Sequence, residues 1–77
     1  MTQNDFHFKI EDQLGVISRN DKTGWTKELN RITWGSTSKL DVRSWKDDSH
    51  EHMSRGITLT NEEGLRLMQL LRMYFDR

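Results

Sequence analysis

The sequence Ile57-Thr58-Leu59-Thr60-Asn61-Glu62-Glu63 marks the point at which the apolar pattern of this chain changes its period. Before it, apolar residues alternate with polar ones, which is typical of strands with one solvated face. After it, apolar residues recur at helical spacing. Thr60 and Glu63 have the spacing of a capping box, in which each side chain accepts a hydrogen bond from the other residue's backbone N–H. The sequence therefore predicts a helix that begins directly after Thr60.

Alternating residues predict strands before this point. The first strand is expected at residues 6–10, and a weaker one at 14–18 after a polar bend at 11–13. Segments rich in Asn, Asp, Gly and Ser typically form turns, and a longer polar loop separates the last two strands. Two further strands are predicted at residues 39–43 and 56–60. The turns lie at residues 20–24 and 35–38, and the longer loop lies at residues 46–54.

The pattern of residues 25–34 fits two secondary structures. Trp25, Leu29 and Ile32 recur at helical spacing, whereas the threonines and tryptophans of the segment favour a strand. Leu29 and Ile32 would point to opposite faces of a regular strand, and a bulge would reconcile them. The pattern alone leaves helix and strand open.

Length and composition limit the class of protein. Residues 1–77 make one domain, and the absence of cysteine excludes disulfides and thiolate metal sites. No apolar run reaches the ~20 residues of a membrane span, and the N-terminal sequence lacks a secretory signal pattern. We therefore expect a cytoplasmic protein with no membrane association. A chain this short buries only about 60% of its unfolded surface, so a second copy is the expected source of further stability.

The predicted helix carries more apolar surface than one sheet contact needs. At about 100° per residue, its apolar side chains fill an arc of roughly 160°, although a helix that only covers a sheet needs about 100°. Leu65 and Met73 lie outside this arc, among polar residues. The surplus predicts a homodimer in which the helices of two subunits meet. The expected interface residues are Leu67, Met68, Leu71, Tyr74 and Phe75.

No constellation of residues supports catalysis or a bound cofactor. The carboxylates are scattered, and there is no nucleophile motif such as Gly-x-Ser-x-Gly. His50 and His52 flank Glu51, but structural zinc normally takes four ligands, mostly Cys and His, at recognisable spacing. We interpret this segment as a solvated loop, and we expect a non-enzymatic protein without metal or cofactor.

The charge of the chain is polarised although its sum is zero. Residues 19–46 contain seven basic and three acidic side chains, a net charge of +4, together with all three tryptophans. Surfaces for single-stranded nucleic acid combine cations that follow the phosphates with rings that stack on bases, at ~1–3 kcal/mol per base. The candidate nucleic-acid-binding residues are Arg19, Lys22, Trp25, Lys27, Arg31, Lys39, Arg43, Trp45, Lys46 and Arg55.

Strand geometry gives the three tryptophans different expected places. Lys39, Arg43 and Trp45 share one face of their strand, opposite its two aliphatic residues, which should point to the core. We therefore predict an exposed ring for Trp45. Core packing is expected for Trp34, and both places stay open for Trp25.

Several stretches follow one another in a recognisable order. Residues 41–45 read Asp-Val-Arg-Ser-Trp, an acidic loop follows, and residues 54–63 read Ser-Arg-Gly-Ile-Thr-Leu-Thr-Asn-Glu-Glu. This order resembles the C-terminal domain of the eukaryotic transcriptional positive cofactor four. Residues 24–31, Gly-Trp-Thr-Lys-Glu-Leu-Asn-Arg, resemble a strand of its bacterial YdbC-like branch more closely. The resemblance covers roughly residues 6–71.

The resemblance implies an α+β fold, a curved antiparallel sheet of four or five strands followed by one C-terminal helix, which dimerises largely through that helix. It implies that residues 25–34 form a bulged or strongly twisted strand. It also implies that the paired sheets bind single-stranded DNA with little sequence preference.

Individual site residues follow from the resemblance by position. The stacking tryptophan of the family matches Trp45, and its neighbouring strand arginine matches Arg43, although one residue separates them here and two in the eukaryotic domain. Their relative facing therefore stays open. The base before the last strand matches Arg55. The family's aromatic in the basic turn matches Trp25 loosely, with Lys22 and Lys27 as its phosphate partners.

We expect a nucleoid-associated, homodimeric single-stranded-DNA-binding protein that acts in transcription, replication or repair, together with proteins of those processes. Two alternatives stay open. The same surface could dock a polymerase or nuclease as a protein-binding adaptor, and RNA could be the natural ligand, since stacking and charge do not read the sugar.

Overall fold

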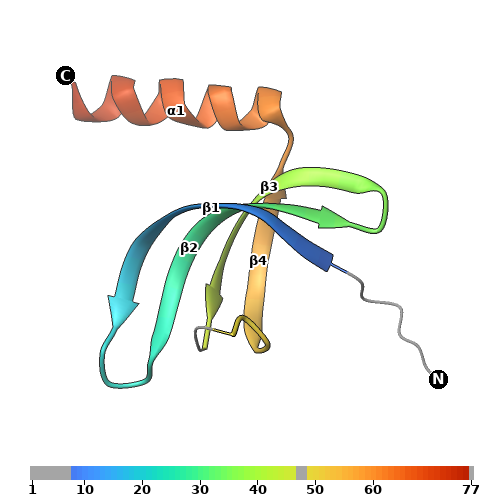
Figure 1. Cartoon of the computed structure of the whole chain (residues 1–77). Coiled ribbons are helices and arrows are strands. Elements are labelled where there is room, and N and C mark those ends of the chain that lie inside the picture. The colour runs from blue at the N-terminus through green and yellow to red at the C-terminus, as the bar shows by residue number, and fades with distance from the viewer. Residues whose placement is uncertain (1–7, 47–48, 77) are drawn as a thin grey trace.

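The computed structural model describes residues 8–46 and 49–76. Four strands, β1 (Phe8–Asn20), β2 (Trp25–Trp34), β3 (Thr37–Trp45) and β4 (Met53–Leu59), are followed by one helix, α1 (Asn61–Phe75). The strands form one antiparallel sheet in the order β1-β2-β3-β4, and Figure 1 shows it strongly curved, with α1 beyond its convex side. The predicted α+β fold is therefore confirmed. Phe6, the start of the first predicted strand, lies outside the described residues.

Both short turns form where composition predicts them. The side-chain oxygen of Asn20 accepts hydrogen bonds from the backbone N–H groups of Lys22 and Thr23, at 3.0 and 3.2 Å. Gly24 closes this turn at φ 83°, and Gly35 begins the next one at φ 61°. Glycine reaches these left-handed conformations without steric penalty, so both positions favour it.

β1 is one continuous strand, so the predicted bend at residues 11–13 and the separate strand at 14–18 are wrong. Its pairing with β2 shifts register three times, and each shift leaves one extra residue in β1. The extra residues are Glu11, Leu14 and Ile17. A bulge bends its strand and increases the local twist, so three bulges at three-residue spacing account for much of the curvature. The bulges also let the chain continue as a strand across residues 11–17, where apolar and polar residues do not alternate regularly.

β2 is a strand, as the resemblance implies, and of the two expected forms, bulged or strongly twisted, the bulge is absent from its pairing with β3. It pairs with β3 without a register shift from Thr26 to Trp34. Leu29 and Ile32 do point to opposite faces of the sheet. A regular strand accommodates both because each of its faces packs against other side chains.

The two faces of the sheet differ in character. The convex face, on the side of α1, carries the aliphatic residues that line a groove beneath the helix; from the sheet these are Ile17, Leu29, Leu40, Val42 and Leu59. The concave face contains the fully buried side chains of the described residues, which are Ile32, Trp45, Asn30 and Asp41. Curvature brings the side chains of the concave face together, so they cover one another without a second layer.

α1 begins as the capping box predicts. The Thr60 hydroxyl accepts a hydrogen bond from the Glu63 N–H at 3.1 Å, and the Glu63 carboxylate accepts one from the Thr60 N–H at 2.8 Å. Gly64 lets the first turn approach β3, because a Cβ at this position would lie 2.5 Å from Leu40 Cδ1. Apart from Gly64, the described residues of the helix are exposed. No helix in the described part of the chain is long and apolar enough to cross a membrane.

Candidate nucleic-acid interface

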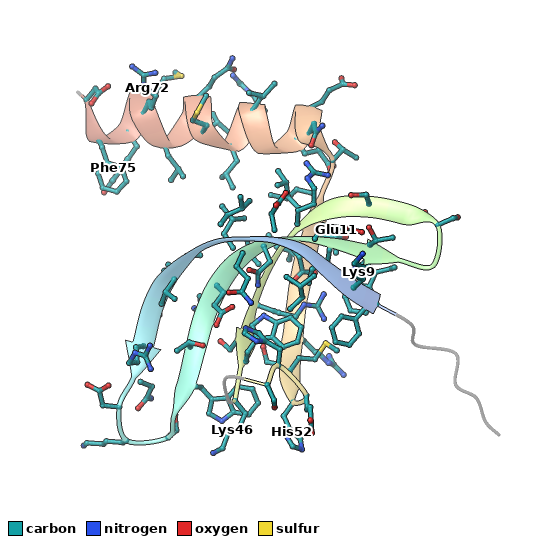
Figure 2. The ribbon with its side chains drawn as sticks, viewed as in Figure 1. Lys9, Glu11, Lys46, His52, Arg72 and Phe75 are labelled. Atoms are coloured by element: carbon teal, nitrogen blue, oxygen red, sulfur yellow. The ribbon has the colours of Figure 1, made fainter. Side chains whose placement is uncertain are left out.

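Four of the predicted binding cations lie beside the indole of Trp25, at the end of the sheet that carries the β1–β2 turn. Trp25 is half-buried and lies between two hollows of about 630 and 590 Å³. The ammonium of Lys46 lies 5.8 Å from the centre of its ring and donates a hydrogen bond to the Thr23 carbonyl oxygen at 2.8 Å. Figure 2 shows Lys46 beside His52 at this end. We call the group the Trp25 patch; it consists of Arg19, Lys22, Trp25, Lys27 and Lys46.

A second group lies on the concave face and consists of Trp34, Lys39 and Arg43, which line a hollow of about 490 Å³. We call it the Trp34 patch. The guanidinium carbon of Arg43 lies 5.0 Å from the centre of the Trp34 ring, and the ring of Phe8 packs at 5.2 Å from it. Trp34 was expected in the core, but it is only half-buried, and a cation stacks on it.

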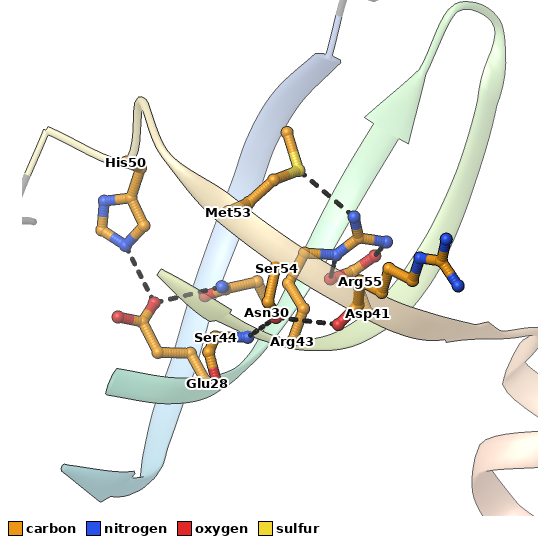
Figure 3. Close-up of polar contacts among 9 residues, drawn as sticks. All are labelled: Glu28, Asn30, Asp41, Arg43, Ser44, His50, Met53, Ser54 and Arg55. Atoms are coloured by element: carbon orange, nitrogen blue, oxygen red, sulfur yellow. Dashed lines mark hydrogen bonds and ion pairs between the residues drawn. The ribbon is translucent and has the colours of Figure 1, made fainter. Parts of the chain in front are cut away.

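The guanidinium of Arg43 is held in place by Asp41. Its Nε donates a hydrogen bond of 2.7 Å to Asp41 Oδ1, and its Nη2 donates one of 2.7 Å to Asp41 Oδ2 (Figure 3). Asp41 is fully buried. Two parallel hydrogen bonds fix the plane of the guanidinium as well as its position. Arg43 is therefore a positioned stacking group whose charge is largely balanced within the protein.

Trp45 corrects the prediction of an exposed ring. It shares the concave face with Lys39 and Arg43, as strand spacing predicts, but none of its surface is exposed. Phe8 and His50 pack against it, with ring centres 5.7 and 5.0 Å away. The curvature of the sheet folds these neighbours over a position that would be solvated on a flat sheet.

The loop after β3 brings His50 into a buried polar network, so its interpretation as a solvated segment is wrong for this residue. Figure 3 shows His50 pointing to Glu28, whose Oε1 accepts hydrogen bonds from His50 Nε2 at 2.9 Å and from Asn30 Nδ2 at 3.2 Å. Glu28 Oε2 accepts one from the Thr26 hydroxyl at 2.7 Å. Burial raises the pKa of Glu28, but these hydrogen bonds outweigh it and hold the pKa below its ordinary value of 4.5.

Two predicted binding residues lie apart from both patches. Arg31 is on the convex face, where its guanidinium donates to the side chains of Ser38 and Asn61 and ties the start of α1 to the sheet. Arg55 is exposed in a bulge of β4 between Met53 and Gly56. The hydroxyl of Ser54 in the same bulge accepts the Ser44 N–H at 3.0 Å (Figure 3), which replaces a missing ladder bond.

The predicted interface residues of α1 are exposed in the single chain. Leu67, Met68 and Leu71 line the groove of about 480 Å³ between the helix and the convex face, where they are 39 to 48% exposed. Tyr74 and Phe75 extend beyond it, and their rings contact each other edge-on at 4.9 Å. Figure 2 shows Phe75 on the side of α1 where the sheet lies.

Sequence reasoning missed the polar interior of the concave face. Glu28, Asn30 and Asp41 are ordinary surface residue types, and His50 belongs to a polar loop. One available signal was that Thr26, Glu28 and Asn30 alternate along the same face of β2. Three polar residues on a face that continues into Ile32 indicate a hydrogen-bonded network, since buried polar groups need partners.

Among residues 8–46 and 49–76, no three His, Asp or Glu side chains gather in a way that could hold a metal ion. No protein-family model matches the sequence. A protein of Treponema pallidum (strain Nichols), described as an "Uncharacterized protein", is 36% identical over 72 residues, which cover 92% of this chain and 82% of the Treponema protein. The chain belongs to the same family as this Treponema pallidum protein.

Proposed function

We propose that this chain is a non-enzymatic, homodimeric single-stranded-DNA-binding protein that holds unpaired strands on its curved sheet. The observation that carries the proposal is the Trp25 patch, where four cations lie beside an accessible indole. Cations follow the backbone phosphates, and the ring accepts an unpaired base, which a duplex does not offer. The Trp34 patch, on the opposite face of β2, would add a second contact through the guanidinium of Arg43, which is stacked on Trp34 and oriented by Asp41.

Accessibility assigns the two tryptophans of the predicted site different roles in this proposal. Trp25 is half-buried beside two hollows, whereas Trp45 is fully buried. A base can stack only on a ring whose face it can reach. We therefore assign base stacking to Trp25, and support of the concave face to Trp45.

The apolar groove beneath α1 supports a homodimer. Met68 and Leu71 are about half exposed on a helix whose backbone approaches the described sheet at β3 and β4, and whose first residue, Asn61, is hydrogen-bonded to Arg31 of β2. A folded domain rarely leaves a contiguous apolar surface of this kind in water. A second copy presents an identical helix, so a two-fold pair would cover both grooves at once.

The resemblance to the positive cofactor four domain supports a role in transcription, replication or repair at the nucleoid, with proteins of those processes as partners. The measurement that tests DNA binding is a fluorescence-anisotropy titration of labelled oligonucleotides at two salt concentrations. The probes are a single strand of about 20 nucleotides, longer than one binding site, and the matching duplex.

We expect the single strand to bind more tightly than the duplex and to weaken with salt. The logarithmic slope should be about −3 per subunit, if each of the four cations of the Trp25 patch meets one phosphate. No binding at low salt would overturn the proposal. A tighter complex with RNA of the same sequence would assign the surface to RNA instead.

A further inference from the structure

A separate hollow of about 260 Å³ lies on the concave face between β1 and β2. It adjoins the Trp25 patch, because Arg19 lines both this hollow and the larger one beside Trp25. Trp25 and Lys27 lie on the face of β2 opposite to the floor of this hollow, so a strand bound at the Trp25 patch would reach the hollow by crossing the edge strand β1 at Arg19. The residues that line it are Gln13, Gly15, Val16, Arg19, Thr26, Glu28, Asn30 and His50.

The hollow has a polar floor and an open rim. Thr26, Glu28 and Asn30 are at most 9% exposed and form the floor, whereas Val16 is 56% exposed and Arg19 is exposed at the mouth. The half-buried ring of His50 forms part of the wall. An apolar side chain and a flat ring at the sides, with polar groups beneath, suit a flat heterocycle with a polar edge.

Most of the unused hydrogen-bonding capacity of the floor is that of acceptors. The Thr26 hydroxyl, one of the two N–H groups of the Asn30 amide and His50 Nε2 all donate to Glu28, so these three protons are already taken. The carbonyl oxygen of Asn30, a residue that is only 1% exposed, has no hydrogen-bond partner among the described residues. A carboxylate accepts about four hydrogen bonds, and Glu28 receives three.

His50 closes the wall in a conformation that its surroundings maintain. Its backbone φ is 59°, a left-handed value that is uncommon for a residue other than glycine. The hydrogen bond to Glu28 and the edge-on contact with Trp45 hold it there. Such conformations persist where the surrounding structure over-determines them, often at ligand sites.

We propose that this hollow holds one base of the bound strand and selects a base with an exocyclic amino group over thymine. The inference rests on the function proposed above and adds a base preference to it. An amino group of cytosine or adenine would donate to the spare acceptor of Glu28, whose carboxylate lies in the floor. Thymine and uracil instead present two carbonyl oxygens on either side of a single N–H, and these oxygens would face the acceptors of the floor. Arg19 would hold the adjoining phosphate.

The test compares anisotropy titrations with oligo(dC) and oligo(dU) of equal length in slightly alkaline buffer, where neither base is protonated. These probes share the sugar, the phosphates and the ring size, and differ only on the base edge that the hollow would read. We expect oligo(dC) to bind about fivefold or more tightly, at the lower end of the discrimination that one good polar contact to a base provides. Equal affinities for the two would overturn the inference and leave the proposed function standing. Absence of binding to both would overturn the two together.

Two variants test whether the preference for oligo(dC) arises in this hollow. Glu28→Gln replaces one acceptor of the floor with a donor at nearly constant shape, so the ratio of oligo(dC) to oligo(dU) affinity should fall to one or below. Glu11→Gln is the matched control: the Glu11 carboxylate accepts from the Thr33 hydroxyl at 2.9 Å, outside the hollow, and this variant should keep the preference. Retention of the preference in a folded Glu28→Gln variant would contradict the assignment. If that variant does not fold, the comparison of the two probes on the unaltered protein still decides.

Discussion

The two faces of the sheet differ in how their side chains are covered in a chain too short for a large core. The concave face completes its own packing, with Trp45, Ile32, Asn30 and Asp41 fully buried and the polar groups largely paired with one another. The convex face is apolar but open, with Ile17 and Ile57 more than half exposed and a helix that leaves a groove above it. Exposure in the single chain therefore has a different cause on each face. The concave face is hollowed where a ligand would fit, whereas the convex face lacks a covering layer.

We expect the largest effect, on assembly and folding, from a charged residue placed in the apolar groove between α1 and the convex face. In the Leu71→Glu variant a carboxylate would have to be buried in the groove without a partner, which is costly, so we expect monomeric or unfolded protein. Light scattering compares the mass of the variant with that of the unaltered protein, which we expect to be dimeric, and circular dichroism reports folding. Gln69→Glu, which adds the same charge on the polar side of α1, should remain dimeric. A folded, dimeric Leu71→Glu variant would place the interface elsewhere.

Breaking the concave face should destabilise the fold of each subunit. Trp45→Ala removes a fully buried ring, and we expect a loss of about 3–5 kcal/mol in the free energy of unfolding, measured by urea denaturation. Trp25→Ala is the matched substitution at a half-buried ring, and should cost much less. Equal losses in the two variants would mean that the two rings do not differ in structural role.

A substitution in the Trp25 patch should weaken DNA binding and leave the stability of the fold nearly unchanged, the reverse of what we expect for Trp45. We expect Trp25→Ala to weaken the binding of single-stranded oligonucleotide by about 1–3 kcal/mol, the value of one stacked base. The salt slope should be unchanged, because no cation is lost. Lys9→Ala removes an exposed cation outside both patches and serves as the control that should bind normally. Unaltered affinity of a folded Trp25→Ala variant would remove Trp25 from the interface.

The smallest expected effect concerns the pH dependence of the polar network on the concave face. The pKa of Glu28 is lower in the folded protein than its ordinary value of 4.5, so its carboxylate stabilises the fold above that pH. This contribution is lost as the pH falls below 4.5 and through the lowered value. Urea denaturation of the unaltered protein and of Glu28→Gln, which cannot titrate there, should therefore converge as the solution is acidified. A difference that widens on acidification would contradict the lowered pKa.

The sequence was informative where one physical signal dominates. The capping box of Thr60 and Glu63 and the period of two in β3 and β4 predict those elements, because both depend on nearby residues. The continuity of β1 could not be predicted from its own alternation, since its bulges are defined only against β2. The burial of Trp45 follows from curvature, which spacing along one strand does not contain. His50 reaches Glu28 across 22 positions of sequence, and no local pattern indicates such a contact.

The bulges of β1 also affect whether copies of this protein can aggregate through their sheet edges. β1 is an edge strand, and the unpaired N–H and C=O groups of such an edge can template the addition of a further strand and the growth of aggregates. Extra residues at Glu11, Leu14 and Ile17 leave only two residues in regular register between one bulge and the next. A straight incoming strand would lose its match after those two residues, so the irregularity that curves the sheet also protects its open edge against polymerisation.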